Sequence, residues 1–453
     1  MSSKTSLLLQ RPLDEPLAWL SDNKKPTTVS GQQFLWHVNQ VAQQLPEKSE
    51  YSINLCDNRY LLLVSICAVI LRKQCTLLPP NKNVATQQDL QERYNNAYVL
   101  HDGKVELASQ IQQISLADFD LTQTGVAENF QVDLDQVALI SFTSGSTGFS
   151  KANIKTWRTL QQSTQINVRH MLPEQSMTLY HLATVPGQHM WGLETSVLMS
   201  LFANVCLVDA KPLFPNDILT LLQKIPSPVG LISTPLHLRA LNISARDMDS
   251  VPELSHVLTA TAPIQNSLAK ELENRFNTTV TEVYGCSEVG SMAYRNPSQK
   301  DNWTQFDGLK FTFKGTQASV STNYLPEPVT LDDQLETLNE TQFKLVGRST
   351  DQIKIAGKRG SLFEVNRVLN NFDGLIDGVV IFPEQTRLVP RLIALVVLKD
   401  PELKPDLQNY FREHLDAAFV PRPIFLVDKL PREENGKLNK SVLHDFYLSL
   451  KND

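Results

Sequence analysis

The stretch SFTSGSTGFSK (141–151) sets two glycines among serines and threonines and closes on a lysine, directly after the apolar run VALI (137–140). Glycine lets backbone N–H groups approach an anion closely, while hydroxyl groups and a lysine add donors and positive charge. The stretch therefore predicts a strand that leads into a phosphate-binding loop, although a solvated linker has a similar composition. Two residues separate Gly148 from Lys151, which disfavours the Walker pattern, in which lysine follows glycine directly.

Helix and strand signals alternate on both sides of this loop. Helical spacings or long apolar runs mark residues 27–46, 60–71 and 157–172, and short apolar runs mark strands at 75–80, 204–210 and 229–234. Such alternation predicts an α/β fold of layered sheets. Residues 303–347 are instead rich in threonine, phenylalanine and valine with period-two stretches, which predicts a small β-rich antiparallel subdomain.

The C-terminal part of the chain has its own pattern. A helical stripe over residues 365–372 is followed by strands at 378–382 and 392–398, a helix opened by Pro405 and a strand at 424–427. We therefore expect a large N-terminal domain over residues 1–347 and a small α+β domain over residues 348–453.

Composition excludes several classes of protein. The chain has 453 residues, 42% of them hydrophobic, and a formal net charge of −6, which argues against a general nucleic-acid binder. Its five cysteines show no CxxC spacing, so we expect no disulfide framework and no zinc site, but reduced thiols in the cytoplasm. The most apolar run, residues 60–71, is too short for a membrane span, which needs about 20 residues.

Four further stretches accompany the glycine-rich loop: LTATAPI (258–264), VYGCSEVG (283–290), LVGRSTDQIKIAGKRGSLFEV (345–365) and LPREENGKLNK (430–440). In residue types, order and spacing, the five together resemble the adenylate-forming superfamily, which includes acyl-CoA synthetases, aryl-acid ligases, peptide-synthetase adenylation domains and luciferases. One such motif would be weak, whereas five in order are specific. The resemblance runs from about residue 50 to the C-terminus.

The resemblance implies an AMP-binding domain with a mobile C-terminal lid. It also implies a reaction in which a carboxylate attacks the α-phosphate of ATP to give an acyl-adenylate and pyrophosphate. The loop would hold the β- and γ-phosphates through Thr143, Ser144, Gly145, Ser146, Thr147, Gly148 and Lys151. The nucleotide site would also include Thr259, Ala260, Thr261, Gly285 and Ser287.

Individual roles follow from the same resemblance. Glu288 matches the glutamate that holds Mg²⁺, and Tyr284 would stack on adenine. Asp333 would bind both ribose hydroxyls, because a carboxylate can accept two hydrogen bonds from a diol. Its neighbour Asp332 is the alternative, and Arg348 would also reach the ribose.

Lys437, directly after a glycine, would bridge the acid substrate and the α-phosphate. His189 stands near the acyl site, either as a gate or as a packed residue. The pocket for the acid would include Trp191, Gly192, Cys286 and Val289. Trp191 either closes this pocket to a short aromatic acid such as a hydroxybenzoate or belongs to the core.

The expected acid lacks an α-amine. Amino-acid-activating relatives place an aspartate in the segment corresponding to residues 186–196, and this chain has none there. Glu194 is the only acidic residue of the segment, and we expect it to lie one turn too far along to bind a substrate ammonium.

A thiol acceptor is suggested by KIAGKRG (354–360), because Gly357 would line a pantetheine tunnel once the lid turns. The acceptor would be coenzyme A or the phosphopantetheine of an acyl carrier protein. A basic mouth would suit either, formed by Lys358, Arg359, Lys429, Arg432 and Lys440. Two alternatives remain: an enzyme that stops at the adenylate or uses a non-thiol acceptor, and a non-catalytic nucleotide-binding relative, against which Glu288 and Lys437 argue.

Overall fold

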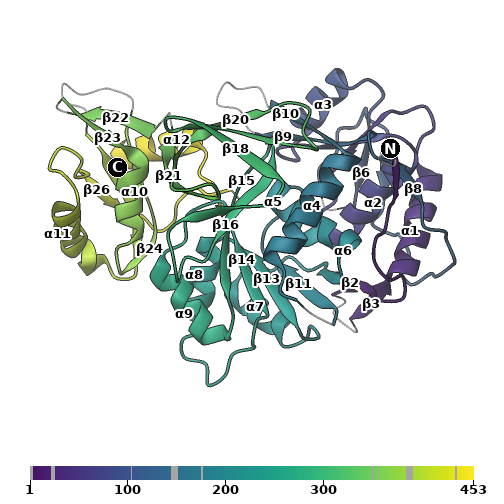
Figure 1. Ribbon diagram of the computed structural model, residues 1–453, viewed down its shortest axis with the longest axis horizontal. Helices are drawn as coiled ribbons and strands as arrows, with labels where there is room; N and C mark the ends of the chain where they lie inside the picture. The colour runs from purple at the N-terminus through teal and green to yellow at the C-terminus, as the bar shows by residue number, and fades with distance from the viewer. Residues whose placement is uncertain are drawn as a thin grey trace.

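The structure is a computed structural model. It describes residues 4–21, 26–103, 105–143, 151–174, 177–348, 351–355, 357–383, 391–433 and 436–452, without the side chains of Thr143 and Asn452. The expected mixed α/β fold, with a large N-terminal part and a small C-terminal part, is confirmed (Figure 1).

A sheet of thirteen strands forms the middle of the large part. Its parallel region contains β2 (Pro16–Leu20), β12 (Val205–Val208), β11 (Leu179–Ala183), β13 (Val229–Ser233), β14 (His256–Thr259) and β15 (Val280–Cys286). Helices α7 (Pro215–Leu222), α8 (Pro235–Ser244) and α9 (Asn266–Phe276) cover one face of these strands (Figure 1). Apart from β15, which carries Thr281 and Glu282 and is partly exposed at its end, these strands are buried and mostly apolar, as parallel strands with both faces covered are.

Antiparallel strands extend the same sheet beyond β15. They are β16 (Gly290–Arg295), β17 (Trp303–Gln305), β18 (Leu309–Lys314), β19 (Gln317–Thr322), β20 (Val329–Thr337) and β21 (Gln342–Arg348). The antiparallel pairing expected for residues 303–347 is therefore present, but these strands continue the large sheet instead of forming a sheet of their own. As a result, Asp333 on β20 pairs directly with Arg348 at the end of β21.

A second sheet has six strands in the order β10 (Lys151–Thr156), β9 (Val137–Thr143), β5 (Cys75–Leu78), β4 (Tyr51–Asn54), β6 (Tyr98–His101) and β7 (Gln113–Ser115). Helix α2 (Arg59–Leu71) is buried along nearly its whole length, as its apolar run predicts. Helix α4 (Trp157–Met171) follows β10. Among the described residues, no helix is both long enough and apolar enough to cross a bilayer.

The helix expected over residues 27–46 is shorter than predicted. Residues Thr27–Ser30 form strand β3, which pairs with β2, and helix α1 spans Gly31–Gln44. Ser30 ends the strand and starts the helix, because its hydroxyl accepts from the N–H of Gln33 and the Gln33 side chain bonds back to the Ser30 backbone.

The small C-terminal part lies at one end of the molecule (Figure 1). It contains β22 (Gln352–Ile355), β23 (Lys358–Ser361), α10 (Leu362–Asn370), β24 (Leu375–Ile381), β25 (Ile393–Leu398), α11 (Lys404–His414), β26 (Ile424–Leu426) and α12 (Lys440–Asn452). A separate hydrophobic cluster around Leu369, Ala394 and Phe411 stabilises it. The domain boundary between residues 347 and 348 stays a prediction.

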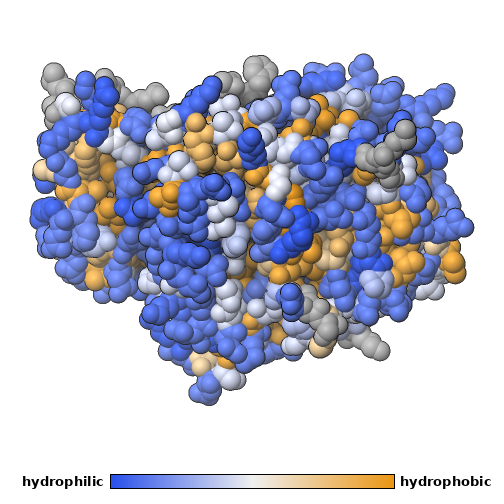
Figure 2. All heavy atoms as spheres, viewed as in Figure 1, coloured by the Kyte–Doolittle hydropathy of each residue, from blue (hydrophilic) through white to orange (hydrophobic). Residues whose placement is uncertain are grey.

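Figure 2 shows a mostly hydrophilic face with hydrophobic side chains in small groups.

Candidate active site

Hydroxyl side chains gather where the parallel strands end. Thr184 follows β11, Ser233 ends β13, and their hydroxyl groups lie 2.9 Å apart. Thr259 ends β14, and Thr261 follows with a positive φ of 79°. The hydroxyl groups of Thr259 and Thr261 are buried and have no hydrogen-bond partner among the described residues. The carboxyl edge of a parallel sheet is where open α/β folds bind ligands.

Glu288 lies in the turn between β15 and β16. Lys151, at the start of β10, donates to Glu288 Oε1 at 2.8 Å. Burial tends to raise the pKa of Glu288, but the hydrogen bond and charge of Lys151 outweigh it, so that its pKa is lowered and the carboxylate is ionised. The predicted phosphate-loop lysine and the predicted metal ligand are thus in contact.

Lys155 is a residue of the site that sequence reasoning missed. It is 1% exposed, and its ammonium donates to the backbone carbonyl of Glu288 at 2.6 Å. On β10 the usual alternation is inverted, since Lys155 faces inward while Ile154 is 63% exposed. A reading from hydrophobic periodicity places Ile154 inside, so the sequence pattern carries no signal for this lysine.

Tyr284, Asp333 and Arg348 form a hydrogen-bonded group. The Tyr284 hydroxyl donates to Asp333 Oδ2 at 2.8 Å, and Arg348 Nε donates to Asp333 Oδ1 at 2.8 Å. Asp333 is 15% exposed, whereas Asp332, which points to the other face of β20, is exposed. The geometry thus joins Asp333, and not Asp332, to the predicted adenine and ribose residues.

Lys437 follows Gly436 in a turn of the C-terminal part that lies against the large part at Thr234. Lys437 interacts electrostatically with Arg348 and Glu288, although its side chain remains accessible to solvent. Desolvation by the surrounding protein lowers the pKa of Lys437, and the positive charge of Arg348 lowers it further. The preceding residue, Gly436, lies against Thr234: a Cβ built on Gly436 would be 3.5 Å from the Thr234 hydroxyl.

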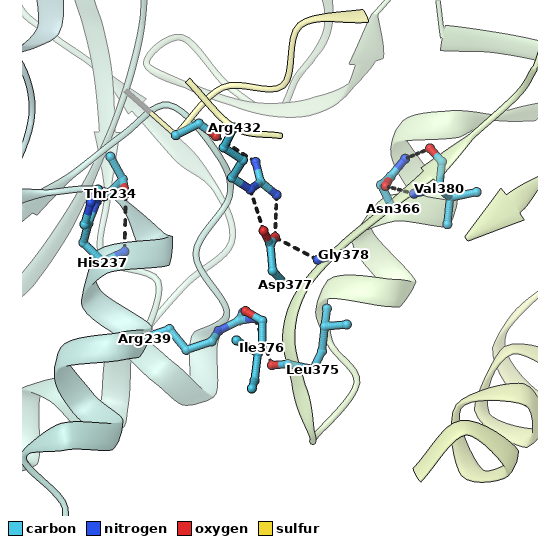
Figure 3. Close-up of polar contacts among 11 residues, drawn as sticks. Thr234, His237, Arg239, Asn366, Leu375, Ile376, Asp377, Gly378, Val380 and Arg432 are labelled. Carbon is cyan, nitrogen blue, oxygen red and sulfur yellow. Dashed lines mark hydrogen bonds and ion pairs between the residues drawn. The ribbon is translucent and has the colours of Figure 1, made fainter. Parts of the chain in front are cut away.

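Arg432 supports the turn that carries Lys437 (Figure 3). Its guanidinium binds both carboxylate oxygens of Asp377, at 2.8 and 2.6 Å, and donates to the carbonyl of Gly436 at 2.7 Å. From α8 of the large part, Arg239 donates to the carbonyls of Leu375 and Ile376 at 3.0 and 2.7 Å. A small pocket lies between these contacts.

The predicted basic mouth is therefore only partly available to an anionic partner. The charge of Arg432 is engaged by Asp377, and Lys358 pairs with Asp416 at 2.5 Å. A positive residue in a motif predicts a charge but not the carboxylate from a distant element that neutralises it.

The segment predicted to border the acid lies next to the nucleotide residues. His189 is half-buried and precedes helix α5 (Met190–Gly192). The half-buried Trp191 and Cys286 pack against the hydrophobic cluster that contains Tyr284 and Val289. At Gly192 a Cβ would lie 2.1 Å from the carbonyl of Pro186, so glycine is required by this turn itself.

Other predicted residues also have defined places. Gly285 lies at a bulge of β15, where a Cβ would be 2.5 Å from the carbonyl of Gly290. Ala260 is buried after β14, and Ser287 is half-buried in the turn beside Glu288. Gly357 lies in the turn between β22 and β23 with a φ of +83° and open space around it.

The predicted glycine-rich loop lies outside the described residues. This applies to Ser144, Gly145, Ser146, Thr147, Gly148 and the side chain of Thr143. Within the described residues there is no group of three or more potential metal ligands. One ionised carboxylate, Glu288, nevertheless suits Mg²⁺ in a nucleotide site, because this ion is usually held by one or two carboxylates together with phosphates and water.

Comparison with known proteins identifies the family of the chain. The family model described as AMP-binding enzyme matches residues 36–323. Medium-chain fatty-acid–CoA ligase of Escherichia coli (strain K12) is 24% identical over 381 residues, which are 75% of this chain and 66% of that protein. A linear gramicidin synthase protein of Brevibacillus parabrevis is 26% identical over 205 residues, which are 43% of this chain. The matched part is 4% of that synthase protein, so the chain spans a small part of it.

Among solved structures, o-succinylbenzoate CoA synthetase from Bacillus subtilis, in complex with its acyl-adenylate intermediate, is similar with a TM-score of 0.76. The two chains share 18% sequence identity, and the match covers 92% of this chain and 93% of that one. At this identity the likeness shows a common fold.

Proposed function

Because the chain belongs to the AMP-binding enzyme family, we propose that it is an ATP-dependent carboxylic acid ligase. An oxygen of the acid's carboxylate attacks the α-phosphorus of ATP, and the bond from that phosphorus to the pyrophosphate oxygen breaks. The products of this step are an acyl-adenylate and pyrophosphate. A thiolate then attacks the acyl carbonyl, and AMP leaves with the electron pair of the broken carbon–oxygen bond.

One observation carries this proposal. Glu288 is bonded to Lys151 and lies four residues after Tyr284, whose hydroxyl donates to Asp333, to which Arg348 also donates. Residues that are far apart in sequence and implied to act on the phosphates, the metal and the ribose are thereby brought to one place. Positive charge held beside a reacting phosphate stabilises the charge that develops in the transition state.

The chain's own residues divide the work. Asp333 accepts from Tyr284 and Arg348 and is thereby oriented to receive the ribose hydroxyls, while the Tyr284 ring would face the adenine. Lys151 holds the side chain of Glu288 through its carboxylate, and Lys155 holds the turn by donating to the backbone carbonyl of Glu288. Mg²⁺ bound by Glu288 would neutralise phosphate charge.

The acceptor is proposed to be a phosphopantetheine thiol, either of coenzyme A or of a carrier protein. Support comes from Gly357, around which space is open. A hairpin turn with positive φ also requires glycine, so an enzyme that stops at the adenylate is the second candidate.

ATP–pyrophosphate exchange with a panel of acids tests the first step. We expect short aromatic acids to exchange faster than long-chain fatty acids, because Trp191 lies in the segment that borders the acid. Thioester formation, followed by mass spectrometry with coenzyme A and with a phosphopantetheinylated carrier protein, tests the second. Exchange without thioester formation would leave the adenylate-only function, and no exchange with any acid would refute the ligase.

A further inference from the structure

Arg239 joins the two parts of the chain. It lies half-buried on α8 of the large part, and its Nη1 donates to the carbonyls of Leu375 and Ile376 at 3.0 and 2.7 Å. Both acceptors are backbone atoms at the start of β24, in the C-terminal part. A guanidinium is a charged donor, and its hydrogen bonds are stronger than those between neutral groups.

The shape of β24 prepares these carbonyls. The strand pairs with β25 in an antiparallel register that shifts between Leu375 and Asp377, so that Ile376 has no partner residue on β25. Such a β-bulge leaves its extra residue out of the ladder and bends the strand. The backbone at Ile376 can therefore accept a bond from outside its own sheet, and Arg239 supplies the donor.

The residue after this bulge continues the contact toward Lys437 (Figure 3). Asp377 directly follows Ile376, and its two carboxylate oxygens accept from Arg432 at 2.8 and 2.6 Å. Arg432 also donates to the carbonyl of Gly436 at 2.7 Å, and Lys437 is next in sequence. A displacement of β24 at its bulge would therefore reach the turn that carries Lys437 through two hydrogen-bonded side chains.

The same helix also contacts that turn directly. Thr234 is the N-cap of α8, and a Cβ built on Gly436 would lie 3.6 Å from the Thr234 Cβ. Arg239 lies about one and a half helical turns further along α8. Helix α8 therefore contacts the C-terminal part at two separate points, which together fix its orientation as well as its position. A small pocket lies between these contacts, lined by Thr234, Arg239, Asp377, Arg432 and Gly436 among others.

The bonds of Arg239 cross between the parts and do not hold the large part together. Among the described residues, its side chain makes hydrogen bonds only to β24. Arg275 on α9 differs in this respect. It is also half-buried, but it donates to the side chain of Asn242 and to the carbonyl of Ala245, at 2.8 and 3.1 Å, within the large part.

We propose that Arg239 is a positioning residue of the adenylation step, because it holds the C-terminal part on α8 and thereby places the turn that carries Lys437. The arrangement in which α8 holds β24 and this turn is called the docked arrangement below. The inference rests on the proposed ligase function. It adds a residue that lies outside all five motif stretches and that acts through Lys437, without touching the reacting atoms itself.

The first test compares the two half-reactions in Arg239→Met. Methionine keeps a long, flexible side chain but removes both bonds to β24. Pyrophosphate release should fall about tenfold, because hydrogen bonds from a charged donor are worth about that factor or more. Thioester formation from a chemically prepared acyl-adenylate should change less than about twofold, because Lys437 is proposed to act only in adenylation. Arg239→Lys, which keeps a charged donor, should recover part of the adenylation rate.

The second test measures the docked arrangement without using activity. The double variant Thr234→Cys/Gly436→Cys brings two thiols to positions whose Cβ atoms lie 3.6 Å apart, within the range of about 3.5–4.5 Å found in disulfides. Under mild oxidation, the rate at which the linked peptides appear in mass spectrometry reports how often the two parts are docked. Adding Arg239→Met to this double variant should lower that rate about tenfold, as it lowers pyrophosphate release.

Arg275→Met is the matched control, since it removes comparable bonds within the large part. It should leave both the cross-linking rate and the ratio of the two half-reactions unchanged. Thermal melting identifies the temperatures at which every variant is folded, and the rates are compared there. If Arg239→Met is unfolded at all assay temperatures, Arg239→Gln replaces it, with the same expected results.

The outcomes separate this inference from the ligase function. Equal losses in the two half-reactions would mean that Arg239 only stabilises the fold, and would overturn the inference while the ligase function stands. A cross-linking rate or a pyrophosphate rate that loss of Arg239 leaves unchanged would overturn it too. A parent protein that exchanges no acid would overturn both the ligase function and the role of Arg239 in it, even if cross-linking still depended on Arg239.

Discussion

Replacing Arg432 by methionine should separate the two half-reactions. Its guanidinium bonds to both oxygens of Asp377 and to the carbonyl of Gly436, directly before the proposed catalytic Lys437. Methionine keeps much of the volume and the flexibility of the side chain, but removes these three bonds. The turn that carries Lys437 would then lose the contacts that hold it in place. The hydrogen bond between Tyr284 and Asp333, which are predicted to bind the adenosine part of ATP, would not be affected.

The size of the effect follows from the contacts. The side chains of Arg432 and Asp377 are 18% and 13% exposed, so their pairing is worth more than a surface ion pair. A hydrogen bond from a charged donor, such as the bond to Gly436, contributes about 1.5–3 kcal/mol, and loss of that amount lowers the population of correctly placed Lys437 roughly 10- to 100-fold. Pyrophosphate release should fall by this factor.

Two assays check the expected effect of Arg432→Met. Pyrophosphate release measures adenylation, and thioester formation from a chemically prepared acyl-adenylate measures the second half-reaction. Only the first should fall strongly, because Lys437 is proposed to act only there. Lys399→Met is the control on the same domain, since Lys399 pairs at 3.3 Å with a fully exposed Asp373. Arg432→Lys should restore part of the rate. An equal loss in both assays would mean that Arg432 only stabilises the domain, and an unchanged pyrophosphate rate would refute the reasoning.

Lys437→Ala should lower pyrophosphate release by about 100-fold or more but spare transfer from a prepared adenylate; an equal loss in both would contradict its role. Glu288→Gln should raise the Mg²⁺ concentration needed for half-maximal adenylation at an unchanged melting temperature, whereas early melting with normal Mg²⁺ dependence would make it a packing residue. Gly357 has a φ of +83°, so Gly357→Ala should lower the free energy of unfolding by about 1 kcal/mol. Gly357→Leu should in addition block thioester formation but not adenylation. If Gly357→Leu formed the thioester as fast as Gly357→Ala, the proposed pantetheine tunnel would be refuted. Burial lowers the pKa of His181 to about 4 and that of His256 well below its usual range, so below pH 6.5 the unfolded state binds more protons. As the pH falls below 6.5, His181 should therefore cost up to about 1.4 kcal/mol of unfolding free energy per pH unit down to about pH 4, and His256 should act in the same direction. His256→Gln should weaken the pH dependence of the urea-measured unfolding free energy between pH 7 and 5, and an unchanged pH dependence would contradict the burial of this histidine.

The elements that the sequence predicts best are those whose side chains follow a simple burial pattern. Helix α2 is apolar on every face and is fully packed, and α4 has one apolar stripe; both occur where expected. The apolar spacing places the start of α1 too early because Thr27–Ser30 pair with a strand, and only the Ser30–Gln33 capping pair marks the true beginning.

The candidate site is predictable only in part, for a physical reason. Asp333 and Arg348, which belong to motifs, lie side by side because neighbouring strands bring them together. Lys155 and the pairing of Arg432 with Asp377 depend on partners from distant elements, and no local pattern reports such a partner. Glu194 stands out in the sequence as an acid in the wrong place for an ammonium, but its nearly complete burial is visible only in three dimensions.

The inverted alternation of β10 has a consequence for how the strand finds its register. A slip of one residue against β9 would turn Ile154 inward and Lys155 out to solvent, which hydrophobic burial alone would favour. What opposes this slip is electrostatic: the lysine's bond to the Glu288 carbonyl and its attraction to Glu194. The strand that follows the glycine-rich loop is therefore held in register by a buried lysine, and that lysine also fixes the turn that carries Glu288.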